Sequence, residues 1–231
     1  MGLYRRMLKG KSRIYDKFLT NPKVVKISII GSIVTWFSAL ILGFIVAQFD
    51  PQGYNIVDNY ISDMGSFHHT PLPYFLDYGA IISSILMIPA IYWMEKQLSP
   101  SPIDRWNGEF PRMRYRLSGL GSFFMFFGVF GFMMIGVFSE DRTTPLGLHF
   151  LFSVVVFSGF IFMSLFYGIL ILFYKTEIPR LMGVYMGIVP FTTGVIFIFN
   201  FTPFWEWMML IGLLIWMVPV FLILLKNINK E

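Results

Sequence analysis

Ionisable side chains gather in one polar stretch of the sequence, residues 54–69, which lies between two hydrophobic runs. Its ionisable groups with useful chemistry near neutral pH are Asp58, Asp63, His68 and His69. A later polar connection adds Asp141, and His149 follows it. Carboxylates and imidazoles are the side chains that most often act as general acids and bases. The candidate catalytic residues are therefore Asp63, Asp141 and His149.

The same stretch is rich in aromatic and aliphatic residues, which predicts that it folds back over the helix ends. A carboxylate buried there needs a proton or a cation beside it. Arg142 is a competing partner, so a structural salt bridge from it to Asp58, Asp63 or Asp141 is the alternative. Glu206 lies near a predicted helix N-terminus, where the helix dipole favours a carboxylate without any function.

A metal site is the second chemistry that these residue types permit. Zinc accepts histidine and carboxylate ligands, and in catalytic sites it keeps a position for a water molecule that becomes a nucleophile near neutral pH. The candidate ligands are Asp63, His68 and His149. The sequence has no H-E-x-x-H or H-x-x-x-H spacing. It leaves the cofactor unknown, with a divalent metal such as zinc as the one that fits the residue types.

Polar side chains near these groups are the candidate substrate-binding residues. They are Asp58, Ser62, Ser66, Arg142 and Ser153. Ser153 follows His149 by four residues, which places both on one face of a helix. Thr144-Pro145 predicts a helix cap that sets His149 one turn inside the span, where an ionisable side chain prefers the bundle interior. A hydrogen bond from His149 to a neighbouring helix or carbonyl group is the structural alternative.

The composition places these residues in a membrane protein. Hydrophobic residues make up 56% of the 231 and charged residues 13%, with a mean hydropathy of +0.67, whereas soluble domains are about 45–50% apolar and 25% charged. The long runs are apolar on every face, which in lipid is typical of helices. We predict an all-α polytopic protein with six transmembrane helices. The spans are expected near residues 23–48, 73–94, 117–138, 145–173, 181–200 and 204–225.

One six-helix bundle, residues 23–226, accounts for nearly the whole chain. A basic amphipathic segment, residues 1–22, precedes it, and a short tail, residues 227–231, follows it. Of the 18 lysine and arginine residues, only Arg142 lies on the first, third or fifth connection. By the positive-inside rule, both termini are cytoplasmic and residues 54–69 face outward.

The basic balance, a net charge of +5, is therefore a signal of topology. Nucleic acid is not an expected partner, membrane lipids are, and the sequence does not define the oligomeric state. We expect a multi-pass protein of the cell membrane with cytoplasmic termini. The absence of cysteine excludes disulfides, thiolate metal sites and cysteine nucleophiles.

Two short motifs resemble a known family. Ile61-Ser-Asp-Met-Gly65 follows the first span, and Phe138-Ser-Glu-Asp141 precedes the fourth. The combination resembles the six-helix membrane proteins called domain of unknown function 998, which are distantly similar to the Frag/DRAM-type group. Some eukaryotic members of that group act in remodelling lipid anchors or in organelle membranes. The resemblance implies a six-helix fold over nearly the whole chain but supplies no catalytic residues. It points to Ser62, Asp63, Gly65, Asp141 and His149.

Two functions follow from these observations. The first is a membrane-embedded hydrolase or acyl/lipid transferase that uses an outward-facing Asp/His cluster on a lipid ester or phosphate. The second is a non-catalytic lipid-binding or assembly protein whose polar cluster closes the outer end of the bundle. A small-molecule transporter is third, because the middle of every span lacks the charged groups on which ion-coupled transporters depend. The sequence leaves open whether the protein is an enzyme.

Overall fold

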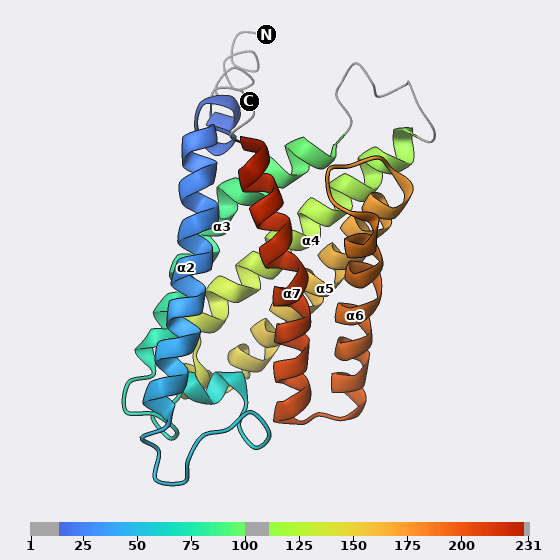
Figure 1. Cartoon of the computed structure of the whole chain (residues 1–231). Coiled ribbons are helices and arrows are strands. Elements are labelled where there is room, and N and C mark those ends of the chain that lie inside the picture. The colour runs from blue at the N-terminus through green and yellow to red at the C-terminus, as the bar shows by residue number, and fades with distance from the viewer. Residues whose placement is uncertain (1–13, 100–110, 229–231) are drawn as a thin grey trace.

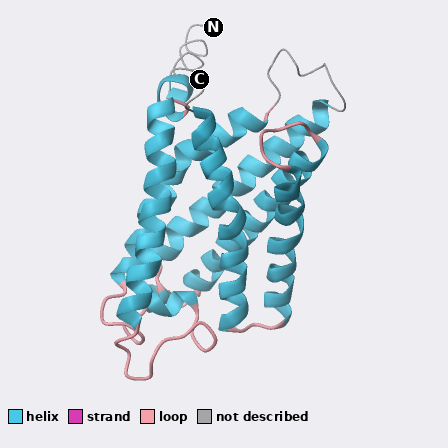
Figure 2. Ribbon diagram, viewed as in Figure 1, coloured by secondary structure: helices cyan, strands magenta, loops and turns pink. Residues whose placement is uncertain are grey.

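The computed structural model describes residues 14–99 and 111–228, and within these ranges it contains six long helices and three short helical turns. The long helices are α2 (Pro22–Ala47), α3 (Tyr74–Leu98), α4 (Pro111–Val137), α5 (Leu148–Phe173), α6 (Arg180–Phe199) and α7 (Pro203–Ile228). The turns are η1 (Tyr15–Leu19), η2 (Ile61–Gly65) and η4 (Glu140–Arg142). Figure 2 shows that every regular element in the described ranges is helical. The predicted all-α class is confirmed.

Each long helix is able to cross a membrane. Their most apolar segments have mean hydropathies between 1.6 and 2.8. A helix rises about 1.5 Å per residue, so roughly 20 residues cover the hydrocarbon core of a bilayer. The shortest of the six, α6, has 20 residues. The six helices therefore match the expected six-span membrane protein.

Helix boundaries agree with the predicted spans to within one residue except at four ends. One of them is the end of α7, which continues to Ile228 and not to residue 225. α3 continues to Leu98, and α4 begins at Pro111, so both extend further at one end than predicted. α5 begins at Leu148, and the cap predicted at Thr144-Pro145 is wrong. Gly147 is the cap residue instead, with a φ of 63° that glycine adopts without steric cost. Residues 1–13 and 229–231 of the two predicted terminal segments lie outside the described residues.

Helices that follow one another in the sequence pack side by side, and α7 returns to lie next to α2 (Figure 1). In this view α2 and α7 stand at the front, the strongly tilted α3 and α4 lie behind them, and α6 forms one edge. α2 begins and α7 ends at the same end of the bundle. The long connection between α2 and α3 covers the opposite end, which we call the loop end.

Small residues bring the helices close together. Gly128 on α4 faces Gly159 on α5 so closely that a Cβ atom on Gly159 would collide with the Gly128 backbone. At Gly131, an added Cβ atom would lie 2.7 Å from the backbone nitrogen of Val156. Close approach at small residues is a common way for membrane helices to gain packing contacts. The α4–α5 pair is therefore closely packed.

Two internal prolines are matched by serines from neighbouring helices. Pro190 has no N–H, so the carbonyl of Met186, four residues earlier, loses its normal partner. Ser164 of α5 donates its hydroxyl to that carbonyl at 2.6 Å. Near Pro89, Ser28 of α2 donates to the carbonyl of Leu86 and accepts from the N–H of Ala90. Each serine satisfies backbone groups that lipid would leave without a partner.

Candidate functional site

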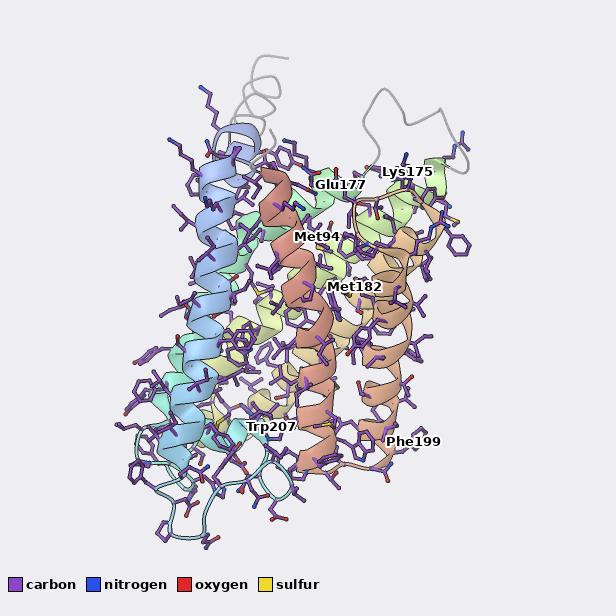
Figure 3. The ribbon with its side chains drawn as sticks, viewed as in Figure 1. Met94, Lys175, Glu177, Met182, Phe199 and Trp207 are labelled. Atoms are coloured by element: carbon purple, nitrogen blue, oxygen red, sulfur yellow. The ribbon has the colours of Figure 1, made fainter. Side chains whose placement is uncertain are left out.

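The connection between α2 and α3 is seated on the helix ends by buried apolar side chains. Tyr54, Ile61 and Met64 are buried in a cluster with Trp207 of α7. The Trp207 indole also donates to the carbonyl of Asn59 at 3.1 Å. Figure 3 shows Trp207 at the loop end of α7, where this connection covers the bundle. The prediction that the polar stretch folds back over the helix ends is confirmed.

The connection between α2 and α3, residues 48–73, is called the cover below. Asp63 and Asp141 stabilise its conformation. Asp63 is buried in η2 and accepts hydrogen bonds from the backbone of Tyr60 at 2.9 Å and the side chain of Asn59 at 3.4 Å. Asp141 accepts from the hydroxyl of Ser66 at 2.8 Å and the backbone N–H of Phe67 at 2.5 Å. Both carboxylates therefore fix the backbone on either side of η2.

Arg142 has a different partner from the three that the sequence suggested. It donates to Asp77 of α3 at 2.6 Å and to the carbonyl of Gly136 at 2.9 Å. The side chain of Asp77 is 5% exposed, whereas that of Arg142 is 45% exposed. The predicted pairing of Arg142 with Asp58, Asp63 or Asp141 is wrong. Asp58 is instead exposed and accepts from Asn55 at 2.9 Å.

His149 is the second residue of α5, and its ring is oriented by a backbone carbonyl. Nδ1 lies 2.7 Å from the carbonyl oxygen of Phe138. Because that oxygen can only accept, Nδ1 carries the hydrogen in the neutral ring and Nε2 keeps its lone pair. Nε2 makes no hydrogen bond to the described residues. The hydroxyl of Ser153 donates to the backbone carbonyl of His149 at 2.9 Å, so Ser153 is positioned one turn further along.

Glu206 of α7 is the second functional group that points into the same region. It is buried, and its Oε2 accepts from the backbone N–H of Ile61 at 2.7 Å. The sequence suggested only a carboxylate at a helix N-terminus. The available signal was its isolation, since Glu206 is the only charged residue between Leu181 and Leu225. Lone ionisable groups inside a span usually mark function or a specific partner.

Two adjacent spaces surround these groups. A lateral groove of about 490 Å³ lies between α5, α6 and α7, with Phe162, Val195 and Ile198 among its exposed apolar walls. A small chamber of about 50 Å³ is adjacent to it; Asp77, Ser139 and Glu140 are among its lining residues, although its open surface is almost entirely apolar. The residues that line both spaces are Ser62, His149, Ser153, Phe157 and Glu206. The groove thus leads from the lipid-facing surface to an imidazole, two hydroxyls and a carboxyl group.

The three predicted catalytic residues are not joined to one another. Within the described residues, no hydrogen bond or ion pair links any two of Asp63, Asp141 and His149. Only His149 lines the groove and the chamber. The predicted substrate-binding residues separate in the same way. Ser62 and Ser153 line both spaces, whereas Ser66 donates its hydroxyl to Asp141. A catalytic role for the three-residue set stays a prediction.

The residues do not fit the predicted zinc site. Among the described residues, no group of three or more His, Asp and Glu side chains is placed to hold a metal ion. His68 is exposed on the cover, and Asp63 is turned toward its own turn. His69 pairs instead with Asp50 at 3.4 Å. A metal site made of Asp63, His68 and His149 therefore has no support in this geometry.

The loop end carries surplus negative charge, and the titratable groups outside the spans respond to it. Loss of hydration and the negative charge of Asp63 raise the pKa of Glu140. Burial, followed by the charges of Asp63 and Glu206, raises the pKa of Tyr54. Burial and then Glu206 and Asp63 also raise the pKa of Tyr60. Tyr60, which lines the groove, is therefore a neutral hydrogen-bond donor at physiological pH.

Fold and site together define a six-helix membrane protein with a lateral groove that shares Ser62, His149, Ser153 and Glu206 with a small adjacent chamber. No family model matches the chain, and neither the curated proteins nor the solved structures contain a match.

Proposed function

We propose that this protein is a membrane-embedded enzyme, a hydrolase or an acyl/lipid transferase, that acts on the acyl ester of a membrane lipid. The observation that supports this most is that the lateral groove, with exposed apolar walls, is also lined by Ser62, His149 and Glu206. In this proposal the acyl chain lies along the apolar walls. The ester group then reaches the end of the groove that is lined by Ser62, His149 and Glu206.

His149 would be the general base. Phe138 holds the ring by Nδ1, which leaves Nε2 free to take a proton. In the proposed step, Nε2 takes the proton of the Ser62 hydroxyl while that oxygen attacks the ester carbonyl. The leaving alcohol oxygen then receives the proton, and the acyl group stays on Ser62 until water or a second alcohol removes it. Electrons and protons balance without a redox partner.

Asp63 and Asp141 would be positioning residues in this scheme. Asp63 closes the turn η2 that carries Ser62. Asp141 fixes the backbone directly after that turn. Their loss would displace the nucleophile without removing a reacting group. Ser153 and Glu206, which line the same space, would bind the polar part of the substrate.

The charge of the chamber favours an ester over a phosphate. Asp77, Glu140 and Glu206 line it, and no lysine or arginine is among its described lining residues. Arg142, the basic residue of η4, is already paired with Asp77. Phosphates are usually held by unpaired Arg or Lys side chains or by helix N-termini. A neutral ester carbonyl avoids the repulsion that a phosphate would meet here.

A non-catalytic lipid-binding protein is the second candidate. It is favoured by the structural partners of Asp63, Asp141 and Arg142, which together close the loop end. A transporter has less support because the spans carry no charged group near their centres. With either candidate we propose membrane lipids as the partner, a cell-membrane location with cytoplasmic termini, and membership of the domain of unknown function 998 family.

The test uses the full-length protein in phosphatidylethanolamine nanodiscs whose lipid carries a radiolabelled acyl chain. His149→Asn keeps a donor for the Phe138 carbonyl but removes the base. We expect it to lower release or transfer of the label by about 10²–10⁴-fold, and Ser62→Ala to lower it similarly. Ser158→Ala, a groove residue that donates to the Val154 carbonyl of its own helix, is the matched control.

Two results would contradict an enzyme. One is equal turnover by the wild type and His149→Asn. The other is that the wild type leaves the labelled lipid intact although the lipid still binds, as shown by a higher melting temperature of the protein. The second result would support the lipid-binding protein.

A further inference from the structure

One oxygen of the Glu206 carboxyl group has no partner in the described part of the protein. Glu206 is 7% exposed, and its Oε2 accepts from the backbone N–H of Ile61 at 2.7 Å. Its Oε1 makes no hydrogen bond to the described residues, among which only the indole nitrogens of Trp93 and Trp216 are both unpartnered and fully enclosed. Oε1 therefore faces open space. A mostly buried carboxyl oxygen is costly to leave unpaired, so a ligand that offers it a hydrogen bond gains binding free energy.

Glu206 lies beside the proposed reacting groups. It lines both the lateral groove and the small chamber, as Ser62 and His149 do. Residues that line both spaces lie where the two adjoin, so the three side chains share one end of the groove. A ligand whose ester reaches Ser62 thus brings the atoms next to that ester within reach of Glu206.

This end of the groove is unfavourable for an anion. No lysine or arginine is among the described lining residues of the groove or the chamber. Burial, and then the charges of Glu206 and Asp63, raise the pKa of Tyr60, a groove residue, so the negative field extends into the groove. A phosphate beside Glu206 would meet a carboxylate or force it to take a proton, and either result costs free energy.

A hydroxyl group suits Oε1 in either protonation state of Glu206. It donates to a carboxylate and accepts from a carboxylic acid, whereas an ammonium group only donates and needs the ionised form. In a diacylglycerol the free hydroxyl is on the carbon next to one that carries an ester. Such a lipid can therefore place its ester at Ser62 and its hydroxyl at Glu206 together.

We propose that the substrate is a neutral acylglycerol with a free hydroxyl, such as a diacylglycerol, and that Glu206 selects it over phospholipids by binding that hydroxyl. This rests on the proposed function and narrows its substrate class. The Ser62 oxygen bonds to the acyl carbon, and the bond from that carbon to the glycerol oxygen breaks. Nε2 of His149 passes the Ser62 proton to the departing glycerol oxygen. Glu206 takes no part in these steps and acts as a specificity residue.

The experiment compares three radiolabelled lipids in nanodiscs of an ether-linked phosphatidylcholine, which has no acyl ester of its own. The labelled lipids are a diacylglycerol, the same diacylglycerol with its hydroxyl methylated, and phosphatidylethanolamine. We expect the wild type to release or transfer label from the diacylglycerol at least about tenfold faster than from either of the others. The methyl ether tests the hydroxyl alone, because it is as neutral as the diacylglycerol.

Glu206→Gln tests the residue. The amide keeps an oxygen for the Ile61 N–H and turns an NH₂ group toward the groove. Turnover of phosphatidylethanolamine relative to diacylglycerol should rise about tenfold, whereas a purely structural role of Glu206 would lower the rates for all three lipids together. Asp58→Asn is the matched control, since it makes the same change at an exposed position that lines neither space, and it should leave the ratio unchanged.

Melting temperatures show whether Glu206→Gln is folded. If it is not, Ser62→Ala, which cannot form the acyl-enzyme, replaces it in a binding test: the diacylglycerol should raise its melting temperature more than the methyl ether or phosphatidylethanolamine does, and an equal rise with all three would overturn the proposal.

Equal rates for the three lipids in the wild type would also overturn the selection and leave the proposed enzyme intact. Faster turnover of phosphatidylethanolamine than of diacylglycerol would overturn it as well and would point to the ammonium group. An unchanged ratio in a folded Glu206→Gln would remove Glu206 as the selecting residue. No movement of label from any of the lipids would contradict the proposed enzyme and, with it, this substrate class.

Discussion

Arg142 is the residue whose removal has the most direct structural consequence. Its guanidinium group joins Asp77 of α3 to the carbonyl of Gly136 at the end of α4. Arg142→Met would leave the buried Asp77 carboxylate without its cation. Removing one member of a fully buried pair costs about 3–5 kcal/mol, and because the arginine side chain is 45% exposed, water offsets part of this. We expect a loss of roughly 1–3 kcal/mol in the free energy of unfolding.

The second substitution Asp77→Asn tests the cause. With the charge removed, the double variant should recover most of the stability that Arg142→Met loses, as measured by melting in detergent. Arg116→Met, at an exposed position of α4, is the control for loss of a cation. If the double variant melts lower than Arg142→Met alone, the buried charge is not the reason for the loss.

Glu140 predicts a pH dependence of stability. Loss of hydration and the charge of Asp63 raise its pKa above the ordinary value of 4.5. Between that value and the raised pKa, the folded state binds more protons than the unfolded state, so stability falls as pH rises. Glu140→Gln removes this term. The variant should gain melting temperature relative to the wild type as pH rises through this window, and the gain should level off above it. Parallel melting curves at all pH values would show that Glu140 does not contribute.

At the scale of the helices, the pairing of Ser164 with the Met186 carbonyl gives a testable coupling between α5 and α6. Ser164→Ala leaves that carbonyl without a donor, because Pro190 has no N–H to supply. We expect a loss of about 0.5–2 kcal/mol, the range of interhelical hydrogen bonds in membranes. In a Pro190→Ala background the N–H of residue 190 can serve the carbonyl, so the same Ser164→Ala change should cost less.

A double-mutant cycle on the free energy of unfolding measures this coupling. Ser158→Ala is the control on the same helix, because Ser158 donates to the Val154 carbonyl of α5 itself. Equal costs of Ser164→Ala in both backgrounds would mean that the serine does not compensate for the proline.

Helix positions were predictable because lipid imposes one solution on a long apolar run. The boundaries that differed depend on local geometry. α5 begins only after Gly147, which adopts a positive φ, although Thr144-Pro145 looks like a cap in the sequence. The burial of Asp63 was also predictable, since its neighbours in the loop are apolar.

The partners at the site were not predictable from sequence spacing. Arg142 meets a residue 65 positions away, and Glu206 accepts from a backbone N–H 145 positions away. His149 is oriented by the carbonyl of Phe138, and a backbone acceptor leaves no signature in the residue types. The groove exists only because α5, α6 and α7 lie side by side, which is a property of the assembled bundle.

At the scale of the whole molecule, orientation in the membrane is the property on which the proposed access to lipid depends. Figure 3 shows Lys175 at the opposite end of the bundle from Trp207 and the cover. The positive-inside rule assigns the Lys175 end to the cytoplasm and the cover to the outside. Because the chain has no cysteine, a single introduced cysteine reports its own position without interference. His68→Cys and Lys175→Cys are suitable, since both residues are exposed on opposite connections.

A membrane-impermeant maleimide added to intact cells should label His68→Cys and should reach Lys175→Cys only after the membrane is permeabilised. The reverse pattern would put the cover, the chamber and the end of the groove at Tyr60 and Ser62 near the cytoplasmic leaflet. The lipid substrate would then have to come from that leaflet, because Tyr60 and Ser62, which line the groove, belong to the connection at the loop end. Labelling therefore decides which leaflet supplies the lipid, independently of whether the chamber is catalytic.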